Sequence, residues 1–139
     1  MSKAAQGMIR LTKWQLDEKR RQLADLEIMR DELQGKIRGL ENEIAHEKKV
    51  ISQSHIVDFS YANFAQETIR RRETLEKSIA DISVSIEEMK DQVAEAFQEL
   101  KQYEILEQRE QERERHKRER RQQAELDEVS LNIHRRRQA

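Results

Sequence analysis

The sequence predicts an all-α protein made of two long helices in an antiparallel coiled-coil hairpin. The chain has no Pro and only 3 Gly among its 139 residues, so few residues suit the tight turns of β-sheet proteins. Charged residues make up 40% of the chain while the net charge is only -1, a composition typical of long helices and coiled coils. Apolar residues also recur at helical spacing in two separate stretches.

The first expected helix covers about residues 8–57 and carries a heptad repeat. Counting in sevens from Ile9, every a position except Arg30 is apolar. Arg30 either tunes the register of the pairing or lays its aliphatic stem across the seam. The a positions are Ile9, Leu16, Leu23, Arg30, Ile37, Ile44 and Ile51. The d positions are Thr12, Lys19, Leu26, Leu33, Leu40, Glu47 and Ser54.

The second expected helix covers about residues 65–130 and has the stronger repeat. Every a and d position between Leu75 and Tyr103 is non-polar or aromatic. The a positions are Ile79, Ile86, Val93 and Leu100, and the d positions are Leu75, Ile82, Met89, Ala96 and Tyr103. This periodicity indicates a packed seam between two helices.

A break between the two repeats predicts the fold-back at about residues 58–64. Residues 55–64 interrupt the pattern, and Asp58 or Ser60 can cap a new helix. The midpoints of the two repeats place the turn close to residue 62, which sets residue 9 opposite about residue 115. The same heptad pattern would also fit the alternative of a straight rod formed by two copies of the chain.

The last part of the chain is charged throughout. From Glu107 to Gln123 no residue is apolar, and many Glu and Arg side chains lie three or four positions apart, as in a solvated helix. We expect the end of this segment to extend beyond the first helix and to finish in a basic tail, 134–139. Residues 1–139 are expected to form a single coiled-coil domain.

Composition and motifs argue against an enzyme, a cofactor and a metal site. The chain has no Cys, its 4 His are scattered, and no Gly-rich phosphate loop occurs. Paired catalytic carboxylates would need a dry pocket, which a two-helix rod lacks. No apolar run reaches the length of about 18 residues that suggests a membrane-spanning helix, and the N-terminus does not resemble a signal peptide. We therefore expect a cytoplasmic protein without direct membrane insertion.

Several apolar residues near the two chain ends lie off the seam and are candidates for partner binding. Leu11 and Trp14 fall at positions c and f, and exposed aromatic side chains often mark binding hot spots. Ile105 and Leu106 also lie off the seam, and the expected register places them near the level of residues 14–20.

A basic cluster next to the fold-back is a further candidate. Arg70, Arg71 and Arg72 form either a solvated helix start or an anchor for an acidic partner surface. Nucleic acid is not expected as a partner, because Glu is interleaved with the C-terminal arginines and no base-stacking aromatic residues accompany them.

The pattern as a whole resembles the flagellar export protein FliJ family. The similarity extends over nearly the whole chain, and injectisome stalk proteins are the nearest confusable relatives. It is carried by residues 11–21, 75–79, 93–97, 100–104 and 123–128.

The resemblance implies a set of partners and a location. Family members act in the central hole of the hexameric flagellar export ATPase, touch the export gate membrane protein and handle other export chaperones. The family's gate contact includes an aromatic residue and a leucine spaced four apart. Leu75 matches the leucine, whereas Arg71 occupies the aromatic position, so Phe64 and Ile69 are the nearby candidates to replace it.

The function expected from this resemblance is that of a stalk and general export chaperone or escort in the flagellar type III protein export apparatus. Its location would be cytoplasmic, peripheral to the inner membrane at the flagellar base. The main alternative is a structural coiled-coil scaffold or spacer with no export role. A peripheral membrane-remodelling helix is a weaker alternative, because it would need a broader apolar face than these narrow seams.

Overall fold

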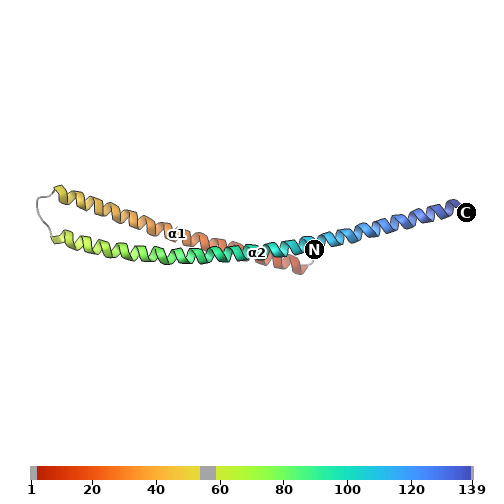
Figure 1. Ribbon diagram of the computed structural model, residues 1–139, viewed down its shortest axis with the longest axis horizontal. Helices are drawn as coiled ribbons and strands as arrows, with labels where there is room; N and C mark the ends of the chain where they lie inside the picture. The colour runs from red at the N-terminus through yellow and green to blue at the C-terminus, as the bar shows by residue number, and fades with distance from the viewer. Residues whose placement is uncertain (1–2, 54–58, 139) are drawn as a thin grey trace. The chain divides into compact units, whose positions relative to one another are not determined.

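Two long helices pack against each other in this protein, which confirms the predicted fold class. The computed structural model describes residues 3–53 and 59–138. Helix α1 spans Lys3–Gln53 and helix α2 spans Phe59–Gln138 (Figure 1). No strand occurs in these two ranges.

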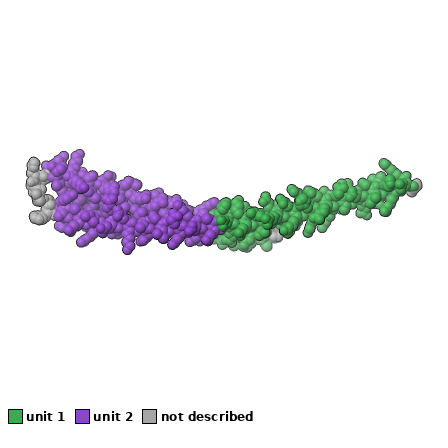
Figure 2. Space-filling view, in the orientation of Figure 1, with its two compact units in different colours: residues 1–16, 96–139 green, residues 17–95 purple. Residues whose placement is uncertain are grey.

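The chain divides into two compact units (Figure 2). Unit 1 contains Met1–Leu16 and Ala96–Ala139, and unit 2 contains Asp17–Glu95. Each unit therefore takes residues from both halves of the sequence. The expectation of a single domain stays a prediction.

In unit 2 the two helices run antiparallel. The Nζ of Lys19, early in α1, donates a hydrogen bond of 2.7 Å to Oε1 of Gln92. Further along α1, Glu41 accepts a 3.0 Å hydrogen bond from Nη2 of Arg72. Later residues of α1 thus meet earlier residues of α2, as in a hairpin.

The seam between the helices follows the heptad positions expected from the sequence. Every a and d position that the structure describes is buried or half-buried, in α1 from Ile9 to Ile51 and in α2 from Leu75 to Tyr103. Ser54, the last expected d position of the first repeat, lies outside the described residues. The most deeply buried apolar side chains are Leu16, Leu40, Ile86 and Leu100. Because apolar burial is the main favourable term in folding, this seam holds the helices together.

In unit 1 the first turns of α1 pack on α2 beyond Glu95. Thr12 and Leu16 of α1 are buried, as is Leu100 of α2. The hydroxyl of Thr12 lies within hydrogen-bonding distance of two carbonyl oxygens of the preceding turn, 2.9 Å from that of Met8 and 3.0 Å from that of Ile9. A hydroxyl that bonds its own helix can be buried without remaining unsatisfied, which explains a Thr in this seam.

The last part of α2 is exposed along its whole described length. All side chains from residue 108 to residue 138 are exposed. Local pairs of the expected kind occur here, including Arg113 with Glu110 at 3.8 Å and Arg115 with Glu119 at 3.8 Å. This stretch therefore owes its helical structure to intrahelical interactions rather than to a core.

The fold-back differs from the sequence-based expectation. Helix α2 begins at Phe59, so residues 59–64 are helical instead of forming part of the turn. Tyr61 and Phe64 are half-buried, with ring centroids 6.4 Å apart, so an aromatic contact stabilises this first turn of the helix. The expected end of the first helix, at about residue 57, lies outside the described residues.

The helix ends and the register are also corrected. Helix α1 already begins at Lys3, and α2 continues to Gln138, so residues 134–138 of the expected tail are helical. Met8 and Tyr103 line the same groove in unit 1, whereas the expected register placed residue 9 opposite residue 115. Helix α2 begins earlier in the chain than expected, which explains this difference. When the midpoint of a hairpin moves by one residue, the residue of α2 that faces a given residue of α1 changes by two.

Crosslinking distinguishes the observed register from the expected one. Starting from the Lys19–Gln92 contact, one further helical turn brings Leu23 to the level of Met89. Cysteines at these two positions should be joined within one chain by a short bis-maleimide reagent. Cysteines at Ile37 and Met89, which the expected register would pair, should react much less. Efficient joining of only the second pair, or products that form solely between chains, would contradict the hairpin described here.

The seam also predicts which substitutions lower stability. Ile86 is 2% exposed, so Ile86→Ala should lower the free energy of unfolding by about 2–5 kcal/mol. The neighbouring Ser85 is exposed, and Ser85→Ala should stay within about 0.5 kcal/mol of the parent chain. Urea denaturation followed by circular dichroism measures both values, and equal losses would contradict the seam assignment.

Candidate functional site

A groove in unit 2 brings together three of the candidate residues. It has a volume of about 620 Å³ and is called the Gly39 groove below. Its lining residues come from both helices and are Lys36, Gly39, Leu40, Glu43, Arg70, Arg71, Thr74 and Leu75. The groove thus combines an apolar floor with a basic wall.

Gly39 has no side chain, which helps to open this groove. A Cβ atom placed on Gly39 would meet no atom within 4 Å, so the space above it is free. Leu40 is buried and Leu75 is half-buried, which provides apolar surface at the base. An apolar side chain of a partner could be covered here while polar groups contact the rim.

The arginines next to the groove have different partners. Arg71 lies 3.9 Å from Glu43, and Arg72 forms contacts of 3.0 Å with both Glu41 and Glu76. Since these pairs are exposed, each contributes only about 0–1 kcal/mol and exchanges readily for another anion. Arg72 therefore pairs both across the helices and within α2, whereas Arg70 and Arg71 line the groove.

The remaining candidates of unit 2 lie outside the lining of the groove. Ile69 is exposed, and Phe64 is half-buried beside Tyr61. Sequence reasoning missed the wall of the groove formed by Lys36 and Glu43 of α1. These residues become visible only with the correct register, because nothing in their own heptad positions marks them.

In unit 1 the four candidate residues near the chain ends are all exposed. Trp14 is 62% exposed and Leu106 is 59% exposed, and Leu11 and Ile105 are nearly half exposed. Folding does not require these apolar side chains at the surface, since none of them belongs to the seam. The expected level of Ile105 and Leu106 beside residues 14–20 is wrong, because Leu106 lies with residues of the first turns of α1.

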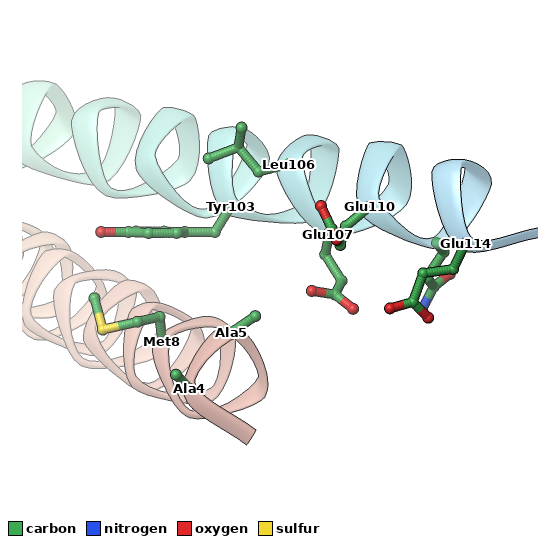
Figure 3. Close-up of a pocket in the computed structure, with 9 residues that line it drawn as sticks. Ala4, Ala5, Met8, Tyr103, Leu106, Glu107, Glu110 and Glu114 are labelled. Atoms are coloured by element: carbon green, nitrogen blue, oxygen red, sulfur yellow. The ribbon is translucent and has the colours of Figure 1, made fainter. Parts of the chain in front are cut away.

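Leu106 lines a second groove, which is called the Glu107 groove (Figure 3). It has a volume of about 480 Å³, and its lining residues are Ala4, Ala5, Met8, Tyr103, Leu106, Glu107, Glu110, Gln111 and Glu114. Figure 3 shows the Glu107 side chain extending from α2 toward the start of α1. Glu107 is only 7% exposed, and its Oε1 has no hydrogen-bond partner.

The heptad repeat of α2 contains a signal for the burial of Glu107. Glu107 follows Leu100 by seven residues and therefore continues the a positions of α2. A charged residue at a seam position normally indicates the end of the packed region. Here α1 still reaches this level, so the carboxylate is buried.

Other kinds of site find no support in the described part of the chain. No group of three or more metal-ligating side chains lies close enough to hold an ion among the described residues. Within the same residues, neither helix contains a stretch apolar enough to cross a membrane.

The fold defines a coiled-coil hairpin with a groove between the helices in each unit. A model of the family described as flagellar FliJ protein matches residues 2–139. The chain therefore belongs to the FliJ family, whose members are non-catalytic components associated with flagellar export. Comparisons with curated proteins and with solved structures gave no match.

Adding a methyl group at Gly39 should stabilise the hairpin. Gly in a helix costs about 0.5–1 kcal/mol relative to Ala, and a Cβ at this position meets no obstacle. Gly39→Ala should therefore raise the free energy of unfolding by about 0.5–1 kcal/mol, measured by urea denaturation. A loss of stability would contradict the open space described above Gly39.

Proposed function

We propose that this chain acts as a stalk in the hexameric flagellar export ATPase and as an escort for other export chaperones. Membership of the FliJ family supports a role in flagellar export. The observation that carries the stalk role is the stretch of α2 from residue 108 to residue 138, which is helical although all of its side chains are exposed. A helix whose side chains are exposed on every face can be surrounded by the subunits of a ring-shaped protein.

The charge pattern of this stretch suits repeated contact and release. Acidic and basic side chains are interleaved from residue 107 to residue 123, and the ion pairs among them are exposed. Exposed ion pairs are worth about 0–1 kcal/mol each, so a ring could exchange them as its subunits change shape. A continuous apolar face would bind more tightly and would hinder such exchange.

The Gly39 groove is the proposed contact with the export gate. Leu75 and Arg71, which correspond to the family's gate-contact positions, both line this groove. Arg71 replaces the aromatic side chain there, and the apolar surface of Leu40 and Leu75 provides the alternative anchor. The gate is a membrane protein, so this contact would bring the chain to the cytoplasmic side of the inner membrane at the flagellar base.

The stalk role predicts that the C-terminal end is needed for ATPase stimulation but not for folding. Deletion of residues 120–139 should leave the stability of the hairpin nearly unchanged, because every described side chain removed is exposed. The same deletion should weaken stimulation of ATP hydrolysis by the export ATPase, and Trp14→Ala should do so too, because Trp14 is an exposed aromatic anchor. Turnover of the purified ATPase with each variant measures the effect.

Salt provides the internal control for this experiment. Stimulation should fall as the salt concentration rises, because the Debye length decreases from about 10 Å at 0.1 M to about 3 Å at 1 M. Full stimulation by the truncated chain, with loss only on changing Arg70, Arg71 or Arg72, would place the ATPase contact in unit 2 and contradict the proposal.

Gate binding is tested by blocking the Gly39 groove. Gly39→Leu should weaken binding to the purified cytoplasmic domain of the gate, because the added side chain occupies the open space above the helix. Ala45→Leu, at an exposed position outside the groove, is the matched control and should bind normally. Binding by calorimetry that is equal for both variants would exclude the groove as the gate contact. A structural spacer with no export role would bind neither the gate nor the ATPase.

A further inference from the structure

The buried carboxylate of Glu107 is a feature of unit 1 that folding does not explain. Glu side chains are almost never fully buried unless they are paired, and buried polar atoms nearly always have a hydrogen-bond partner. Glu107 is 7% exposed, and its Oε1 has no such partner. A leucine at the same seam position would pack against α1 without this penalty, so the carboxylate points to a ligand.

The charge around Glu107 indicates a cationic ligand. Glu110 and Glu114 line the same groove, and no Lys or Arg is among the lining residues that the structure describes. Arg113 lies 3.8 Å from Glu110 and compensates only that carboxylate. Lys3, in the first turn of α1, forms no ion pair with any described residue. Arg115 and Arg118 line a neighbouring hollow together with Glu114. Glu107 thus remains without a counter-charge in the described part of unit 1.

The remaining wall of the groove favours a cationic side chain over a metal ion. Met8, Tyr103 and Leu106 provide an apolar surface beside the carboxylates (Figure 3). No group of three or more metal-ligating side chains among the described residues is placed to hold an ion. An arginine side chain combines an aliphatic stem, which packs on apolar surface, with a planar guanidinium that binds carboxylates through two hydrogen bonds and stacks on aromatic rings.

We propose that the Glu107 groove binds an arginine side chain of a partner protein. The guanidinium lies against the carboxylates of Glu107 and Glu114, and the stem packs on the apolar wall. The inference relies on the proposed function only for the identity of the partner, which would be the export ATPase. The chemistry of the groove stands independently of that identity.

A peptide titration tests the chemistry directly. The probe is a capped peptide of three arginines separated by leucines, and matched peptides contain lysine or the neutral isostere citrulline. They are added to the isotopically labelled full-length chain, and amide shifts are followed by NMR. The arginine peptide should shift signals of Tyr103, Leu106 and Glu107, the lysine peptide should bind more weakly, and the citrulline peptide should not bind.

Substitution of Glu107 separates a specific site from general charge attraction. Glu107→Gln should weaken binding of the arginine peptide about tenfold or more, because it removes a charge-assisted pair from a shielded position. Glu125→Gln removes an exposed carboxylate of the same helix and should change the affinity less than about twofold. Equal effects of the two substitutions, equal binding of the citrulline peptide, or no shifts in the groove would each overturn the proposal.

Two further measurements complete the test. Glu107→Leu should keep or raise the melting temperature while abolishing peptide binding, and unfolding of this variant would show that the carboxylate is structural and overturn the proposal. Shifts in the groove that appear with rising protein concentration and vanish when residues 135–137 are changed to Ala would assign the site to a second copy of the chain instead. Failure of the wild-type chain to bind the export ATPase, with intact peptide binding, would contradict the proposed function but not this site.

Discussion

Packing of the a and d side chains between α1 and α2 is the interaction on which the other features of this protein depend. The seam is narrow, and its few fully buried apolar side chains include Leu16, Leu40, Ile86 and Leu100. It fixes which residues of the two helices face each other in each unit. Both grooves are lined by residues of both helices, so their composition follows from this register rather than from any local motif.

The two grooves lie between the same two helices but differ in the charge of their lining residues. The Gly39 groove has Arg70 and Arg71 on its wall, whereas the Glu107 groove has three carboxylates. Each groove also contains apolar surface next to its charges. Partners of opposite charge would therefore prefer different grooves, because complementary charge favours one partner and like charge disfavours another.

Much of the fold could be predicted from the sequence, because a heptad repeat encodes both helix and burial. The repeat from Ile9 to Ile51 and that from Leu75 to Tyr103 match the buried and half-buried positions of the structure. The position of the turn was predicted less well, since Tyr61 and Phe64 suit either a loop or a first helical turn. The register and the lining of both grooves depend on that position, which explains why Leu106 was placed at the wrong level. The exposed positions of Leu11 and Trp14 followed from the heptad frame alone.

The exposed stretch of α2 has a consequence for how the molecule responds to its surroundings. From residue 108 to residue 138 every side chain is exposed, so the amide hydrogens of this stretch should exchange mainly through local fraying rather than through global unfolding. Its helicity also depends on Glu and Arg pairs, such as Arg115 with Glu119, that salt weakens. Enclosure by another protein would suppress this fraying. Slowed deuterium uptake in residues 108–138 would therefore report when and how deeply the end of the chain is enclosed, even where no new hydrogen bond forms.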